Sequence, residues 1–244
     1  MLLTLIALVV PVQDAPKRPM GEGAAASYEK CEFTSKDGDQ LAYWLMKPSQ
    51  VKKDEKYPLV VCLHGKGGNS TAASVLAKEA LRKKYPAFVM APAAAGNANW
   101  ASPDDRNKNA HLPRVIEAVK KLLETQPIDA DRVYVTGQSM GGYGSWGAAA
   151  TAPGLFAAAV PVCGGWSVDD AAKIAKVAIW AFHGAKDPTV PVTASRTMIE
   201  ALKKAGAEPK FTEYEGVGHN SWEKAYGDDA MWEWLFAQKR KKTE

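Results

Sequence analysis

The stretch DRVYVTGQSMGGYGSW, residues 131–146, carries the feature from which the fold can be predicted. A run of β-forming residues is followed directly by Ser139 and then by a segment with helical character. At such a strand-to-helix turn, a Cβ at Gly137 or Gly141 would collide with a neighbouring strand or helix. The serine oxygen would then project from the sheet edge at a helix N-terminus. The alternative is an ordinary N-cap serine beside flexible glycines, and this short pattern does not exclude it.

The sequence around this stretch alternates between short apolar runs and helical segments. This alternation is typical of βαβ units and of a mostly parallel sheet that is buried on both faces by helices. Before residue 58, two β-rich runs flank Asp37-Gly38, which predicts an antiparallel hairpin. Further strands are predicted at residues 59–65, 87–92, 133–137, 155–164, 177–184 and 210–215, and the helices between and after them include 71–84, 110–125 and 221–239.

A serine nucleophile at the carboxyl edge of this sheet needs a base, and His219 is the best candidate among four histidines. It lies in EGVGHNSW, a glycine-bearing loop after the last predicted strand, from which an imidazole can reach over the serine. His64 and His183 each precede a glycine at a strand end. His111 begins the long helix after Ala110.

Asp187 is the candidate acid that orients the base. It stands in FHGAKDPTVP, just after the strand that precedes the His219 strand. Asp169 and Asp170 are weaker candidates, because they begin a short helix where capping explains them. Asp187 could also be only a turn-former before Pro188. However, the order Ser139, Asp187, His219 is the order of the α/β hydrolases, and the spacing gives each residue its own strand-end loop.

An oxyanion hole requires two backbone N–H groups aimed at the carbonyl oxygen of the substrate. Met140, the residue after the nucleophile, is predicted to supply one. The second is predicted to come from HGKGG, residues 64–68, which ends an early strand. Lys66 is the preferred donor in this loop, and Gly65 is the alternative.

The chain resembles serine hydrolases of the α/β-hydrolase fold. It is most similar to compact carboxylesterases that group with phospholipase/carboxylesterase, feruloyl-esterase-like and predicted-peptidase relatives. The resemblance implies a Ser139–His219–Asp187 triad and ester hydrolysis through an acyl-enzyme. One departure is Gly68, where relatives often carry an acidic or bulkier residue. The matching segments are LHGKGG (63–68), PIDADRVYVTGQSMGGYGSW (127–146), AIWAFHGAKDPTVPV (178–192) and YEGVGHNSW (214–222).

The substrate pocket is predicted to contain aromatic side chains. Of the eight tryptophans, Trp100, Trp166 and Trp222 follow predicted strand ends and could form a wall for an apolar or aryl group. Gln138, next to the nucleophile, is a further candidate. The alternative is that each tryptophan simply fills the core. No cap-sized insertion lies between residues 164 and 177, so we expect an open site that suits small or polymer-linked esters.

Charge and cysteine content argue against several other functions. The formal net charge is +4, and the tail 239–244 accounts for +3 of it, since four basic residues there outweigh one acidic residue. The body is therefore nearly neutral, which argues against a nucleic-acid-binding face. The three cysteines show no CxxC spacing, so we expect no metal site and no redox motif. No organic cofactor is implied by the sequence either. One disulfide among them is left open, and so is the oligomeric state.

The N-terminus, MLLTLIALVVPVQDAPKRP, resembles an export signal. Its apolar run, Leu2–Val10, is shorter than the roughly 20 residues of a membrane span. It lacks a preceding Lys or Arg and a clear A-x-A cleavage pattern. We predict a signal peptide and loose lead-in over residues 1–26, an α/β-hydrolase domain over 27–244, and a periplasmic or extracellular location. A lipid anchor or a misassigned start are the alternatives, and the latter would leave the protein cytoplasmic.

Two other functions compete with a carboxylesterase. The same triad could cleave amides, as in a serine peptidase of the prolyl-oligopeptidase type, although no second domain to gate peptides is evident. The chain could also be a non-catalytic binding module on a hydrolase scaffold, but such a module is expected to have lost a triad residue. An enzyme of the dienelactone-hydrolase type would normally carry cysteine at position 139.

Overall fold

The computed structural model describes residues 17–94, 98–101 and 111–240. The predicted signal run Leu2–Val10 lies outside the described residues. None of the helices formed by the described part of the chain has the length and apolar character needed to cross a membrane.

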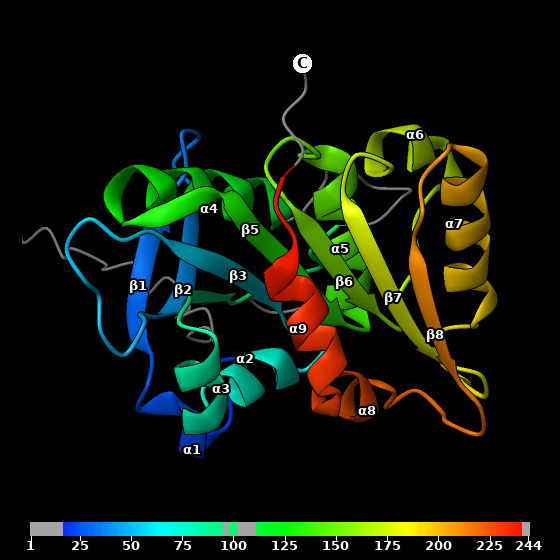
Figure 1. Ribbon diagram of the computed structural model, residues 1–244, viewed down its shortest axis with the longest axis horizontal. Coiled ribbons are helices and arrows are strands. Elements are labelled where there is room, and N and C mark those ends of the chain that lie inside the picture. Colours follow the sequence, from blue (N-terminus) through cyan, green and yellow to red (C-terminus); the bar gives the residue numbers. More distant parts are fainter. Residues whose placement is uncertain (1–16, 95–97, 102–110, 241–244) are drawn as a thin grey trace, which may run out of the picture.

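A mixed sheet of eight strands forms the centre of the described fold, in the order β1-β2-β4-β3-β5-β6-β7-β8 (Figure 1). The first two strands form the predicted antiparallel hairpin, and β2 also runs antiparallel to β4. All remaining pairs are parallel. The strands are β1 (Glu29–Thr34), β2 (Gln40–Met46), β3 (Tyr57–Leu63), β4 (Phe88–Pro92), β5 (Ile128–Gln138), β6 (Ala158–Val162), β7 (Ala178–Gly184) and β8 (Lys210–Tyr214).

Helices cover both faces of the sheet, and the alternation of side chains along β3 shows why. Leu59, Val61 and Leu63 belong to one apolar core, whereas Val60 and Cys62 belong to the other. The first core includes residues of α4 (Leu112–Thr125), α5 (Met140–Thr151), α6 (Ala171–Ile174) and α7 (Thr193–Lys204); the 3-10 turn η1 (Val168–Asp170) precedes α6. The second includes residues of α2 (Thr71–Leu76), α8 (Trp222–Gly227) and α9 (Asp229–Ala237), with α1 (Glu22–Ala25) and α3 (Glu79–Lys84) packed beside them. The predicted α/β-hydrolase architecture is confirmed.

Two helices that the sequence predicts as continuous are each divided in two. The segment 71–84 breaks at Ala77 and Lys78, between α2 and α3. The segment 221–239 breaks at Asp228, whose backbone is extended and whose Oδ1 accepts the Ala230 N–H at 2.9 Å. This carboxylate caps the second helix, a role that helical periodicity alone does not reveal. The described cysteines Cys31, Cys62 and Cys163 are free thiols.

The prediction that residues up to 26 form a loose lead-in is wrong for residues 19–25. Pro19 and Met20 are buried, and Met20 belongs to one of the two cores. The Pro19 carbonyl accepts the Ser70 N–H at 2.7 Å, and residues 22–25 form α1. This segment therefore braces the loop that contains residues 64–70.

The turn from β5 into α5 is packed against the end of β3 with no room for a side chain. A Cβ on Gly141 would lie 2.1 Å from the Leu63 carbonyl oxygen, and one on Gly137 would lie 2.5 Å from the Gly141 carbonyl oxygen. Real Cβ atoms do not approach oxygens so closely. The predicted collision is therefore present at both glycines, and it involves backbone that cannot move aside.

We expect Gly141→Ala to lower the free energy of unfolding by about 3 kcal/mol or more, because the added methyl group must push α5 away from β3. Urea unfolding followed by circular dichroism would measure the loss. Gly154→Ala is the matched control, since no atom lies within 4 Å of its Cβ position. Equal stability of the two variants would contradict this account of the turn.

His111, at the start of α4, is buried against Trp100, with ring centroids 6.3 Å apart. Its Nδ1 has no hydrogen-bond partner among the described residues. Burial is the main cause that lowers the pKa of His111 to about 4, and the positive charge of Arg114 adds to it. The folded protein therefore holds this ring neutral at pH values where the unfolded chain already binds a proton.

This difference predicts a loss of stability as pH falls from about 6.5 to about 4, worth about 3 kcal/mol for His111. Below about pH 4 the folded state also binds the proton, so His111 causes no further loss of stability. His111→Phe keeps an aromatic ring and removes the titration. Urea unfolding at several pH values should give a shallower pH dependence for the variant. Parallel curves for the two proteins would exclude this role of His111.

Candidate active site

Ser139 lies at the junction of β5 and α5 in a backbone conformation that few non-glycine residues adopt. Its φ is 54° and its ψ is −116°. The Ser139 N–H donates to the Val162 carbonyl at 2.9 Å, and its own carbonyl accepts the Tyr143 N–H at 3.1 Å. These bonds and the glycine contacts hold the strained turn in place, as expected where strain serves a site. The hydroxyl stands at the N-terminus of α5, as the sequence predicts.

His219 is within hydrogen-bond distance of both other members of the predicted triad. Its Nε2 lies 2.9 Å from Ser139 Oγ, and its Nδ1 lies 2.7 Å from Asp187 Oδ2. An ionised carboxylate only accepts, so Nδ1 carries the proton and Nε2 is free to accept the serine O–H. The imidazole is partly exposed, at 22% of its side-chain surface, whereas the Asp187 side chain has no exposed surface.

Asp187 receives several hydrogen bonds. Its Oδ1 accepts the N–H groups of Thr189 and Val190 at 2.8 and 2.9 Å. Burial alone would raise the pKa of this carboxyl, but the hydrogen bonds from His219 and the two amides outweigh burial and lower the pKa. Asp187 is therefore ionised and fixed in orientation, which in turn fixes the tautomer of His219.

The loops that carry the acid and the base are joined directly. A Cβ on Gly184, at the end of β7, would lie 2.2 Å from the Gly218 carbonyl oxygen. The Lys186 N–H donates to the Val217 carbonyl at 2.9 Å. The two loops consequently hold one another in register, and the distance between Asp187 and His219 is set by backbone rather than by flexible side chains.

The loop 64–68 passes beside the nucleophile, and its amides differ in availability. The Gly65 N–H donates to the Asn69 carbonyl at 3.2 Å, so it is already used within the loop. Within the described part of the chain, the N–H groups of Lys66 and Met140 have no protein acceptor. Of the two donors considered for this loop, Lys66 is thus the one left available.

His64 holds this loop from within the protein. The Ala94 N–H donates to its Nε2 at 3.0 Å, so the ring proton is on Nδ1, which donates to the Gly65 carbonyl at 2.7 Å. A peptide C=O and the following N–H point in opposite directions. Holding the Gly65 carbonyl toward His64 therefore turns the Lys66 N–H the other way. Burial lowers the pKa of His64, which is consistent with a neutral ring.

Two of the predicted pocket residues are buried and make hydrogen bonds that hold the fold rather than lining a pocket. Trp100 has no exposed surface, and its Nε1–H donates to the His64 carbonyl at 2.8 Å. It cannot form a pocket wall in this arrangement, so that part of the prediction is wrong. Gln138 is also buried, and its Oε1 accepts the Thr71 N–H at 2.9 Å, which anchors the start of α2.

The other two tryptophans lie differently. Trp166 is 9% exposed, donates from Nε1 to Asp170 Oδ2 at 2.9 Å, and packs over Gly147 of α5. Trp222 is partly buried, and its ring stands perpendicular to that of His219 with centroids 5.3 Å apart. Trp222 is thus the predicted pocket residue in direct contact with the triad histidine.

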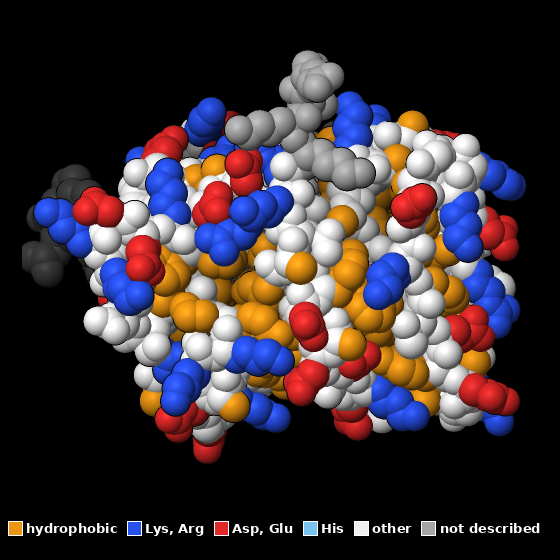
Figure 2. Space-filling model, in the orientation of Figure 1, with side chains coloured by type: hydrophobic (Ala, Val, Ile, Leu, Met, Phe, Trp, Pro, Cys, Tyr) orange, Lys and Arg blue, Asp and Glu red, His pale blue; other side chains and the backbone are white. Residues whose placement is uncertain are grey.

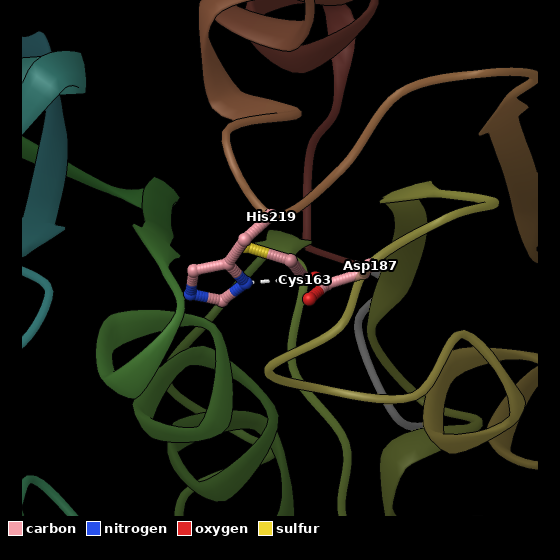
Figure 3. Close-up of side chains that lie close together, drawn as sticks. All are labelled: Cys163, Asp187 and His219. Atoms are coloured by element: carbon pink, nitrogen blue, oxygen red, sulfur yellow. Dashed lines mark hydrogen bonds and ion pairs between the residues drawn. The ribbon is translucent and has the colours of Figure 1, made fainter.

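Sequence reasoning missed two residues that touch the triad. His183 Nε2 lies 3.3 Å from Asp187 Oδ2 and 3.0 Å from the Val190 carbonyl, so it braces the acid loop from inside. The Cys163 thiol lies beside Asp187 and His219 (Figure 3). A signal for His183 was present, because both His-Gly pairs end strands that lead into site loops. For Cys163 the sequence shows only that it follows an apolar run, which gives no signal of a contact with the triad.

Solved structures with this fold include known hydrolases. A thermostable esterase superposes with a TM-score of 0.81 and 36% identity, over 88% of this chain and 64% of that chain. A ferulic acid esterase superposes with a TM-score of 0.64, over 86% of this chain and 97% of that chain, but at 18% identity it shows the fold alone.

Two curated proteins also resemble the chain. Poly(3-hydroxyalkanoate) depolymerase C of Paucimonas lemoignei is 34% identical over 115 residues, 44% of this chain and 28% of that protein. The uncharacterized peptidase YuxL of Bacillus subtilis (strain 168) is 24% identical over 236 residues, 79% of this chain and 35% of that protein. The chain thus spans about a third of the length of the curated relatives it matches.

The model of one protein family, described as Phospholipase/Carboxylesterase, matches residues 49–229. This range includes the loop 64–68, the turn at Ser139 and the loops of Asp187 and His219, and it covers well over half of the chain. The matched segment and the observed sheet agree with the resemblance stated from the sequence. The chain belongs to the phospholipase/carboxylesterase family of α/β-hydrolase-fold proteins.

Proposed function

We propose that this protein hydrolyses carboxylic esters through an acyl-enzyme intermediate on Ser139. The observation that carries the proposal is the unbroken hydrogen-bond chain from Ser139 Oγ through His219 to Asp187, which begins at a strained residue on a strand-to-helix turn. Each member of this chain comes from a different strand end. Such a chain activates a hydroxyl, and a structural serine has no need of it.

In the proposed reaction Ser139 Oγ attacks the ester carbonyl while His219 Nε2 takes its proton. Asp187 stabilises the imidazolium that forms, without being protonated itself. His219 then protonates the leaving alcohol, and the alcohol departs. Water enters, loses a proton to His219 and attacks the acyl-enzyme. The carboxylic acid leaves, and Ser139 recovers its proton.

The negative charge on the carbonyl oxygen would be stabilised by the N–H groups of Met140 and Lys66. Both lack a protein acceptor among the described residues, and Met140 begins α5, whose N-terminus favours negative charge. The internal bonds of His64 hold the Gly65–Lys66 peptide in this orientation before substrate arrives. Donors fixed in advance are most effective, because they need not reorganise during the reaction.

The substrate class is proposed from the surroundings of the triad and from the similar proteins. On the face seen in Figure 2, basic and acidic side chains are interspersed, so that face offers no single-sign surface for a polyanion. The Trp222 ring beside His219 offers an apolar surface to one side of the ester. Similar proteins include an esterase and a polyester depolymerase. We propose small or polymer-linked esters with an apolar or aryl group.

Peptide hydrolysis is the second candidate. It is favoured by the similarity to a protein described as a peptidase, which extends over 79% of this chain. An amide has a poorer leaving group than an ester, and its nitrogen must be protonated by the same His219. We place this activity second, because the thermostable esterase is 36% identical to this chain, whereas the peptidase is 24% identical.

Ser139→Ala is expected to lower kcat/KM for p-nitrophenyl esters by at least about 10³-fold, because His219 bonds no other hydroxyl among the described residues. The substrates would be p-nitrophenyl esters of increasing acyl length, methyl ferulate and a peptide anilide. Ser167→Ala is the matched control. The Ser167 hydroxyl makes an exposed hydrogen bond to Asp169, so this variant should behave as the parent protein. A fluorophosphonate should label the parent and the control but not Ser139→Ala.

Each outcome of this assay assigns the protein to one class of function. Ester cleavage that vanishes with Ser139 supports the proposal, and cleavage of the anilide alone would assign a peptidase. Labelling of Ser139 without cleavage of these substrates would indicate a narrow specificity. Two results would overturn the proposed ester hydrolysis on Ser139. One is activity of Ser139→Ala within tenfold of the parent, and the other is an unlabelled Ser139 in a folded and inactive protein.

Asp187→Asn is expected to lower kcat by about 10³- to 10⁴-fold with little change in KM, because an amide can donate to His219 and favour the wrong tautomer. Ester hydrolysis at saturating substrate would measure it. Asp169→Asn changes the weaker acid candidate, which is exposed and bonded to Ser167, and should leave kcat unchanged. Similar losses in the two variants would show that Asp187 does not have the orienting role.

A further inference from the structure

The thiol of Cys163 lies against the triad, although the proposed reaction makes no use of it. Cys163 directly follows β6, and its φ of 42° is in the left-handed region. Ligand atoms of Cys163, Asp187 and His219 all lie within 4.8 Å of one another. Figure 3 shows the sulfur and the carboxylate beside the imidazole. Three different donor types thus meet from the ends of β6, β7 and β8.

A thiolate, an imidazole and a carboxylate are together a donor set for soft and borderline cations. In a tetrahedral site such donors stand about 3.3–3.8 Å apart. The 2.7 Å between His219 Nδ1 and Asp187 Oδ2 is shorter than this, so these two groups would move apart by less than about 1 Å. Magnesium and calcium prefer six or more oxygen ligands and do not suit this cluster.

We propose that Cys163, Asp187 and His219 form a site for a thiophilic divalent cation, and that its occupation inactivates the Ser139 centre. The inference rests on the proposed function for its inhibitory effect, but the binding itself does not. The cation would coordinate Cys163 Sγ, Asp187 Oδ2 and His219 Nδ1. It would be an inhibitor rather than a cofactor, because it takes over two groups that the reaction needs.

The chemistry of binding explains the inactivation. The Cys163 S–H bond loses its proton to solvent as the metal–sulfur bond forms. The proton of His219 moves from Nδ1 to Nε2 through water, because Nδ1 must offer its lone pair to the cation. Nε2 then carries a hydrogen that it donates to Ser139 Oγ, so it can no longer accept the proton of the serine hydroxyl. The base is lost, and so is its hydrogen bond to Asp187.

The surroundings of the thiol determine which cations can enter. The buried thiol is the soft donor of the cluster, so the site favours cations that bind sulfur strongly, such as Cd²⁺ and Hg²⁺. Cys163 and the Asp187 side chain have no exposed surface, so a cation must pass the partly exposed His219. We expect slow, time-dependent inhibition.

Cadmium chloride added to the full-length protein tests the site with two independent measurements. The first is ester hydrolysis after increasing times of incubation. The second is the ultraviolet charge-transfer absorption of a cadmium–thiolate bond, which needs no substrate. Cys163→Ser replaces sulfur by oxygen at similar size, and Cys163→Ala is a second variant in case the first is unstable. Cys31→Ser, at a partly exposed cysteine away from the triad, is the matched control.

The parent and Cys31→Ser should lose activity at cadmium concentrations at least tenfold below those that affect the Cys163 variants. A chelator should restore it, and magnesium chloride should have no effect. The Cys163 variants should lose the absorption that the parent shows. Equal sensitivity of parent and Cys163 variants, or an active parent that neither absorbs nor is inhibited, would overturn the proposal. Absorption that depends on Cys163 in a protein without hydrolase activity would instead refute the proposed function alone.

Discussion

Helix α5 approaches the end of β3 so closely that backbone packs on backbone, and the site depends on this contact. The Cβ positions of Gly137 and Gly141 are occupied by carbonyl groups of neighbouring chain segments. Only with hydrogen at these positions can the chain turn from strand to helix within one residue. That residue, Ser139, absorbs the strain with a positive φ. The hydroxyl is thereby fixed at the sheet edge, where loops from the other strands can reach it.

The same principle holds the acid and the base. Gly184 allows the loop after β7 to lie directly on the loop that carries His219, and a backbone hydrogen bond joins them. Two buried histidines add internal braces: His64 fixes the Gly65 carbonyl, and His183 contacts the Asp187 carboxylate. Burial lowers the pKa of both rings, so they serve as neutral hydrogen-bonding groups while His219 stays partly exposed. Burial thus separates structural histidines from the one placed to exchange protons.

The sequence was sufficient for features that depend on short-range patterns. The alternation of apolar runs and helices predicts the sheet, and the order of Ser139, Asp187 and His219 along the chain places each of them after a different strand, namely β5, β7 and β8. The sequence was insufficient where a contact between residues far apart in the chain determines whether a side chain is buried. Met20 is buried where the Pro19 carbonyl reaches the Ser70 amide, and the indole of the buried Trp100 bonds the His64 carbonyl. Neither partner is near in sequence. The break at Asp228 likewise depends on a cap that competes with an otherwise favourable helix.

The ionised state of Asp187 links these observations to the chemistry. A buried carboxyl group would ordinarily be held neutral, because removing a charge from water is costly. Here the hydrogen bonds from His219 and from two amides satisfy the charge, so the pKa falls, and His183 contacts the same carboxylate. A charged Asp187 requires a proton on His219 Nδ1 and leaves Nε2 to accept from Ser139. The adjacent thiol does not disturb this arrangement while it keeps its proton. A buried, protonated cysteine is therefore compatible with the triad, whereas any cation that removes its proton would compete for the same carboxylate and imidazole.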